Sequence, residues 1–172
     1  PILFPQALPA TLLGTNKAAA VWGTAWSAWQ YARQVCLPSR RLVGSFVAAL
    51  LGSGVGAWLA TRVPADAFRV ALPLVLAAVW FYTLLRKDLG HAHEPNWAPH
   101  VEAWWATLIG AAVGLYDGLF GPGTGSFFVF ALVRCLGWDF LHASAAAKRL
   151  NVATNLAALA WFIPHGHVVW AL

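Results

Sequence analysis

Residues 114–128, with the sequence GLYDGLFGPGTGSFF, form a glycine-rich segment inside an otherwise strongly apolar part of the chain. The segment contains one proline, Pro122, and a single carboxylate, Asp117. At membrane depth, a backbone that is not helical is tolerated only where protein buries it or where it lines a water-filled cavity. We therefore predict that this segment interrupts a membrane helix and that a solute meets the backbone there.

The composition of the whole chain favours an integral membrane protein. Hydrophobic residues make up 60% of the chain and charged residues only 10%, whereas soluble domains carry about 25% charged residues. The 11 tryptophans also suit a membrane protein, because indole rings gather at the bilayer interface. Cys36 and Cys135 are isolated, so the sequence predicts no disulfide and no metal site, and no cofactor is expected.

Apolar runs near the length that crosses a bilayer, about 20 residues, divide the chain into predicted membrane helices. The runs that predict complete helices are residues 10–35, 41–62, 67–85 and 142–162. Residues 101–114 and 126–136 are each too short to span the bilayer alone. Together they predict a discontinuous helix, or a pair of half-helices, broken at residues 114–126.

Three local signals refine this all-α arrangement. Gly44, Gly52 and Gly56 form a face of small residues on the second helix, which we interpret as a surface for close helix packing. The Trp138-Asp139-Phe140 sequence is expected to cap the helix that follows it. A further span is predicted to begin at His167.

Basic residues lie at the ends of the apolar runs, so the net charge of +5 does not indicate nucleic-acid binding. If the first three helices all cross the bilayer, one side carries Arg33, Arg40, Arg41, Arg86 and Lys87, and the other carries Arg62 and Arg69. Basic loops favour the cytoplasmic side. We predict a multi-pass protein of the inner (plasma) membrane, with residues 88–100 as a cytoplasmic connecting loop. The histidines and the glutamate of this loop are interpreted as part of a hydrophilic connection rather than as a metal site, because no helix fixes their spacing.

A weak internal repeat appears when the chain is shifted so that Lys17 meets Lys148. The same shift aligns Thr24 with Asn155 and Tyr31 with Phe162. Chance similarity between two apolar helices is the alternative explanation. Secondary transporters commonly contain such repeats and bind their substrate at the repeat interface. Residues 1–87 would then hold the latter part of one repeat, and residues 101–172 the first part of a second.

The glycine-rich segment, followed by ASAAAKRLNVATNLAAL at residues 143–159, resembles the second repeat of the TauE/SafE family of sulfite-exporter-like (TSUP) transporters. The sequence LGTNKAAAVWGTAWSAWQYAR at residues 13–33 resembles the helix that follows the glycine-rich break of that family's first repeat. The similarity covers nearly the whole chain. The family's first glycine-rich segment is expected before Pro1 and its last spans after Leu172, so we expect the chain to be the central part of such a transporter.

This resemblance implies the export of a small sulfur-containing anion such as sulfite, sulfoacetate or a related organosulfonate. An oxyanion in a dry site needs hydrogen-bond donors and positive potential, which helix N-termini, glycine backbone, hydroxyls, amides and lysines supply. The residues predicted to bind it are Asn16, Lys17, Gly121, Gly123, Thr124, Gly125, Lys148, Asn151 and Asn155.

Several of these residues have alternative interpretations. An ionisable residue in a membrane helix is functional by default, but Lys17 and Lys148 can also extend to an interface. Asn151 and Asn155 suit a pore lining or an interhelical hydrogen bond equally. Asp117 is predicted to pair with Lys148 or Lys17, in preference to carrying a proton, because an unpaired carboxylate would repel an anion.

The sequence contains no nucleophile with a matching base, so enzyme activity is not expected. The favoured hypothesis is a transporter of the lipid bilayer that works by alternating access on a small anionic substrate. The alternatives are a scaffold or assembly subunit without transport activity and an ion or proton channel. The sequence does not identify the coupling ion or the oligomeric state, and it is compatible with a homo-oligomer.

Overall fold

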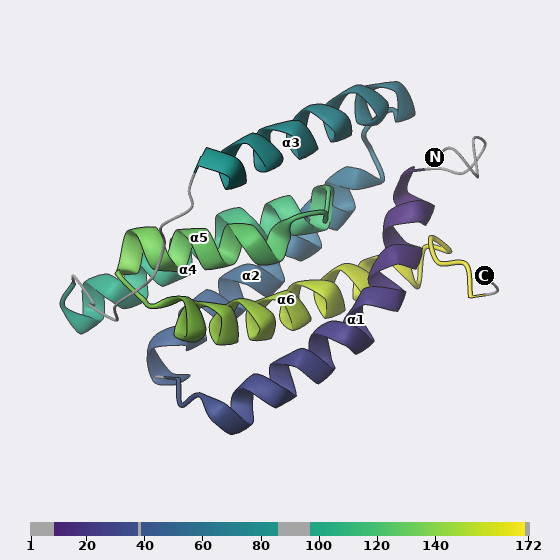
Figure 1. Cartoon of the computed structure of the whole chain (residues 1–172). Helices are drawn as coiled ribbons and strands as arrows, with labels where there is room; N and C mark the ends of the chain where they lie inside the picture. The colour runs from purple at the N-terminus through teal and green to yellow at the C-terminus, as the bar shows by residue number, and fades with distance from the viewer. Residues whose placement is uncertain (1–8, 38, 86–96, 171–172) are drawn as a thin grey trace.

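The computed structural model describes residues 9–37, 39–85 and 97–170. Over these residues the chain is helical and contains no strand, which confirms the all-α prediction (Figure 1). The helices are α1 (Pro9–Gln34), α2 (Ser39–Ala60), α3 (Ala65–Leu85), α4 (Pro99–Leu119), α5 (Thr124–Leu136) and α6 (Phe140–Phe162). The predicted connecting loop at residues 88–100 lies largely outside the described residues, and its last two residues already belong to α4.

Helices α2 and α4 run in the same direction and are joined along their length by small residues (Figure 1). A Cβ atom added to Gly52 would lie 2.6 Å from the carbonyl oxygen of Ala111, and one added to Gly114 would lie 2.6 Å from that of Ala49. These backbones are too close for any larger side chain. The predicted packing role of the glycine face on α2 is confirmed.

The predicted break over residues 114–126 is wrong in its bounds. Gly114 and Gly118 stay inside α4 because they are packed against α2, and α4 therefore reaches Leu119. The turn that follows is short, with φ of +86° at Gly121 and +82° at Gly123, a backbone conformation that favours glycine. Helix α5 then runs back along α4, so that the Tyr116 and Phe127 rings meet at a centroid distance of 4.8 Å. The two segments form an antiparallel helical hairpin rather than two halves of one continuous span.

Helix α6 lies in the interior and contacts α1, α2, α4 and α5. It begins at Phe140, two residues before the predicted start, and the predicted cap is confirmed, because the Asp139 carboxylate accepts hydrogen bonds from the N–H groups of Leu141 and His142 at 2.8 and 2.9 Å. This arrangement is an N-cap, and it satisfies two backbone donors that the helix itself leaves unpaired. Residues 163–166 form a turn and residues 167–170 have no regular secondary structure, so the helix expected from His167 is not present there.

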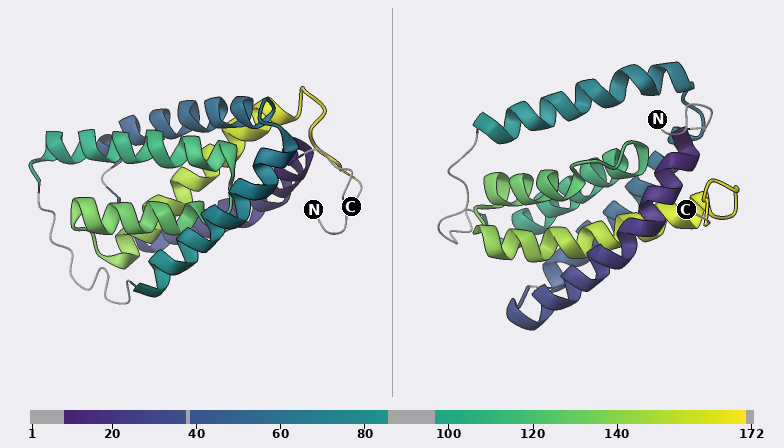
Figure 2. Two further views of the ribbon diagram at one scale, coloured as in Figure 1. Left: turned by 90° about the horizontal axis from the view of Figure 1, so that it is seen from above. Right: turned by 45° about the vertical axis from the view of Figure 1, so that its right-hand side comes forward.

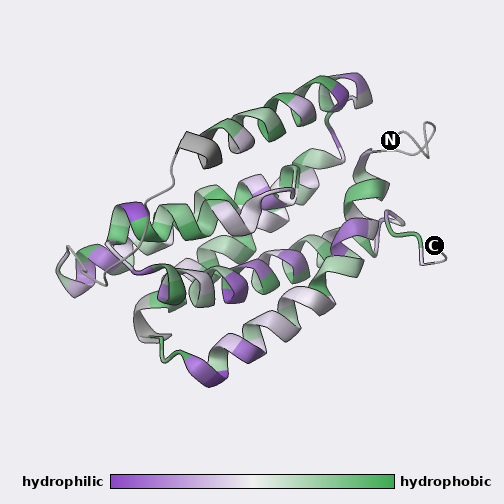
Figure 3. Cartoon of the chain, viewed as in Figure 1, coloured by the Kyte–Doolittle hydropathy of each residue, from purple (hydrophilic) through white to green (hydrophobic). Residues whose placement is uncertain are grey.

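Helix α3 lies apart from the other helices (Figures 1 and 2). Its first turns contact the bundle through Phe68, whose ring lies 5.3 Å from that of Phe120. Figure 3 shows hydrophobic residues over most of its length, and Trp80 and Phe81 are exposed. Within the described residues, the segment Leu42–Ala60 is long and apolar enough, by length and composition, to cross a membrane.

Candidate functional site

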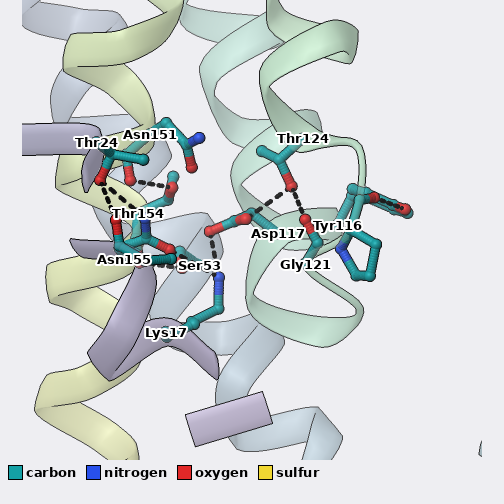
Figure 4. Close-up of polar contacts among 12 residues, drawn as sticks. Lys17, Thr24, Ser53, Tyr116, Asp117, Gly121, Thr124, Asn151, Thr154 and Asn155 are labelled. Atoms are coloured by element: carbon teal, nitrogen blue, oxygen red, sulfur yellow. Dashed lines mark hydrogen bonds and ion pairs between the residues drawn. The ribbon is translucent and has the colours of Figure 1, made fainter. Parts of the chain in front are cut away.

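The predicted site residues fall into two neighbouring groups. The first, which we call the ion-pair cluster, is buried and consists of Lys17, Asp117, Thr124 and Asn155 (Figure 4). The second lines a cavity between α1, α5 and α6 and includes Lys148 and Asn151.

A buried ion pair forms the centre of the ion-pair cluster. Lys17 Nζ lies 2.6 Å from Asp117 Oδ2, and both side chains are 2% exposed. Lys17 also donates a hydrogen bond to Asn155 Oδ1 at 3.2 Å. The two predicted partners for Asp117 were Lys148 and Lys17, and the structure pairs it with Lys17. Because a charge left alone in such a position would cost several kcal/mol, each member of the pair depends on the other.

The glycine turn brings α5 to this pair. The Thr124 hydroxyl lies 2.7 Å from Asp117 Oδ1 and 2.6 Å from the Gly121 carbonyl oxygen, so its single proton serves two acceptors. The Tyr116 hydroxyl closes the outside of the turn by donating to the Pro122 carbonyl oxygen at 2.5 Å. The carboxylate therefore fixes the first residue of α5 as well as the lysine of α1.

The cavity has a volume of about 660 Å³ and lies beside the N-terminal end of α5. Its lining residues are Tyr31, Gly123, Gly125, Ser126, Val129, Phe130, Phe140, Ser144, Ala147, Lys148 and Asn151. The first N–H groups of a helix have no partner within that helix and carry its positive dipole end. Gly125 lies next to Asn151 at this end, since a Cβ there would be in ordinary van der Waals contact with the Asn151 amide nitrogen, at 3.7 Å.

Lys148 is only partly buried and lines this cavity. Over the residues that the structure describes, it forms neither an ion pair nor a side-chain hydrogen bond. Its charge is therefore available to an anion in the cavity, whereas the charge of Lys17 is neutralised by Asp117.

The remaining predicted residues divide between the two groups, with one exception. Gly123, Gly125 and Asn151 line the cavity, and Gly121 lies beside Lys17, whose Nζ would be 3.8 Å from an added Cβ. Asn16 is exposed and joins neither group.

Sequence reasoning missed Tyr31 and Ser144, which both line the cavity. A signal for Ser144 was present, because it precedes Lys148 by four residues and Asn151 by seven, a spacing that places all three on one face of a helix. Tyr31 reaches the cavity from α1, and nothing in the sequence distinguishes it from the other aromatic residues of that helix. No group of three or more His, Cys, Asp or Glu side chains that could hold a metal ion occurs in the described part of the chain.

These features together give an apolar helical bundle with a buried ion pair and, beside it, a cavity lined by one lysine, an arrangement that fits a membrane transport protein. The family model for the sulfite exporter TauE/SafE matches residues 1–172. The chain belongs to this family.

Curated relatives are named as membrane transporters. The chain is 36% identical over 165 residues to "Probable membrane transporter protein YfcA" of Escherichia coli strain K12, with 95% of the chain and 60% of the relative covered. It is 35% identical over 163 residues to "Probable membrane transporter protein ORF9" of Sinorhizobium sp, with 94% of the chain and 61% of the relative covered. A "Probable membrane transporter protein" of Haemophilus influenzae is 32% identical over 162 residues, at 94% and 63% coverage.

The chain thus spans between 60% and 63% of the length of these relatives. No solved structure matches the chain.

Proposed function

We propose that this chain carries the anion-binding part of a secondary transporter that exports a small sulfur-containing anion, such as sulfite or an organosulfonate, across the inner membrane. The observation that carries the proposal is the position of Lys148. Its charge faces a cavity that also receives the N-terminal end of α5. Both features attract an anion, and the cavity holds no described carboxylate that would oppose it.

The sign of the membrane potential agrees with export. An interior that is negative favours the exit of an anion by about 2.3 kcal/mol per charge for each 100 mV. The predicted cytoplasmic position of the loop at residues 88–100 would place the start of α6, and hence Lys148, toward the cytoplasmic half of the bilayer. The cavity would then receive its anion from the cytoplasm.

The arrangement of α1 and α6 supports two inverted repeats and alternating access. The two helices run in opposite directions (Figure 1), as equivalent helices of an inverted repeat must. Asn155 Nδ2 donates to Thr24 Oγ1 at 3.3 Å, and these are positions that the repeat makes equivalent, 131 residues apart. A contact between equivalent positions is expected where the symmetry axis passes between them.

Anion flux into proteoliposomes containing the full-length protein tests this function. Lys148→Gln is expected to lower the uptake of sulfite or sulfoacetate by roughly tenfold or more, since a hydrogen bond to a charged group contributes about 1.5–3 kcal/mol. The matched control is Arg149→Gln, which removes the neighbouring positive charge on α6 outside the cavity lining. Equal flux for the two variants and the parent, or no anion flux in the parent, would contradict the proposal.

A further inference from the structure

The Asp117 carboxylate occupies a site that is built for an anion. Its two oxygens are held separately, one by the Lys17 ammonium at 2.6 Å and the other by the Thr124 hydroxyl at 2.7 Å. An ammonium and a hydroxyl, next to a glycine turn and a helix N-terminus, are the donors that an external oxyanion requires. We propose that Lys17 forms a second anion subsite, that Asp117 fills this subsite in the structure, and that a proton on Asp117 opens it to the transported anion.

This inference rests on the proposed function, because the anion is the one that enters the Lys148 cavity. A line of polar side chains on α6 joins the two places. Lys148, Asn151 and Asn155 lie on one face of the helix, and Asn155 Oδ1 accepts a hydrogen bond from Lys17 at 3.2 Å. Seven residues of helix separate Lys148 from Asn155, which is about 10 Å. An anion that leaves Lys148 along this face therefore reaches Lys17 within a short distance.

The predicted repeat gives Lys17 and Lys148 equivalent positions on their helices. Equivalent positions in an inverted repeat face the same central site from opposite sides of the membrane. In the structure one lysine has no partner among the described residues, and the other is neutralised by a carboxylate of the chain itself. A stepwise transfer of an anion from one lysine to the other requires that the two lysines differ in this way, with one free to bind an anion and the other already paired.

Asp117 is the only described carboxylate that contacts Lys17, so the proton must bind there. The other titratable groups on the helices that hold the pair are Tyr116, next to Asp117 on α4, and Lys148 and Arg149, about two turns before Asn155 on α6. Helix α2 contributes the hydroxyl of Ser53 near Thr154, and α5 contributes that of Thr124, neither of which titrates. The charged groups on α6 are positive and favour the arrival of a second anion.

The charges balance in the proposed step. Asp117 takes one proton from the aqueous phase and becomes neutral, and the anion replaces its carboxylate as the partner of Lys17. The subsite therefore gains one proton and one anionic charge together. Linkage then requires that anion binding at Lys17 strengthens by about tenfold for each unit that the pH falls, until Asp117 is protonated without the anion.

The test counts bound anions on the full-length protein in detergent by isothermal titration calorimetry. Methanesulfonate is the probe, because its single negative charge does not change over the physiological pH range. The parent is expected to bind one ion at neutral pH and a second at lower pH, with proton uptake for the second. Asp117→Asn is expected to bind two ions at neutral pH, because Lys17 is then unpaired.

Two further variants show whether the second ion binds at Lys17. The double variant Lys17→Met, Asp117→Asn removes the subsite without leaving an unpaired charge, and it is expected to bind one ion at every pH. Asp66→Asn, which changes an exposed aspartate in the first turn of α3, is expected to behave like the parent. If Asp117→Asn does not fold, the number of ions bound at low pH by the parent and by the double variant shows whether the second ion needs Lys17 and Asp117.

A parent that binds one ion at every pH, with no proton uptake, would overturn the second subsite and leave the proposed function intact. A parent that binds no ion, while Asp117→Asn binds one, would contradict the Lys148 cavity and support the subsite at Lys17. Equal stoichiometry in Asp117→Asn and in the double variant would also overturn the inference.

Discussion

Two lysines of this chain, Lys17 on α1 and Lys148 on α6, have opposite surroundings. Lys17 is 2% exposed and paired with Asp117, whereas Lys148 is partly buried and lines a cavity. Both could be assigned to the site from the sequence, because a lysine inside an apolar helix is costly unless it has a function. Which of them pairs with Asp117 could not be predicted, since the answer depends on where the glycine turn places α5. The exposure of Asn16 depends in the same way on the rotation of α1.

At the same scale, Asp139 provides a test of local stability. Asp139→Ala removes the acceptor for the N–H groups of Leu141 and His142 and is expected to destabilise the protein by about 1 kcal/mol. Asp139→Asn retains a capping oxygen and should keep most of that stability. Thermal unfolding of the purified protein in detergent measures both variants, and equal losses for alanine and asparagine would show that the cap is not what Asp139 contributes.

At the scale of the helices, glycine has two structural roles in this sequence. Gly121 and Gly123 have positive φ and turn the chain, while Gly114 and Gly118 stay helical against α2. All four looked alike in the glycine-rich segment, so the break was predicted too early. The distinguishing information is the neighbouring helix, which local sequence does not contain. The cap at Asp139 was predictable because it depends only on adjacent residues.

Two glycines allow this difference to be measured. Gly114→Ala places a methyl group against the backbone of Ala49 and is expected to destabilise the protein by about 1–3 kcal/mol, through overpacking. Gly54 is the matched control, because it lies in α2 with open space around it. Gly54→Ala should be neutral or stabilising, since alanine favours a helix by about 1 kcal/mol relative to glycine. Similar effects of the two substitutions on thermal unfolding would contradict the close packing of α2 and α4.

At the scale of the whole molecule, composition predicted an all-helical membrane protein, and the order of the long helices followed from the apolar runs. The direction of α5 could not be predicted, because two short apolar runs fit a straight broken span and a hairpin equally well. The cavity also depends on tertiary structure, since Tyr31 on α1 and Lys148 on α6 line the same cavity only in the folded bundle.

The proposed alternating access requires α1 to move relative to α6, and a cross-link between these two helices tests this. Thr24→Cys with Asn155→Cys, in a background where Cys36 and Cys135 are serine, joins α1 to α6 at two residues that are in contact. Oxidation is expected to abolish anion flux in proteoliposomes, and reduction to restore it. Each single cysteine variant is the control, and full flux in the demonstrably cross-linked protein would argue against movement at this contact.

The contact between α2 and α4 has a mechanical consequence. Side chains at an ordinary helix interface can change rotamer and let one helix slide past the other, but backbone atoms have no such freedom. Because Gly52 meets Ala111 and Gly114 meets Ala49 through backbone, sliding by even part of a turn would drive main-chain atoms into one another. We therefore expect α2 and α4 to move as a single rigid body during any transport cycle. Displacement would then be left to the helices outside this pair, among them α1, which carries Lys17, and α5, which follows the glycine turn.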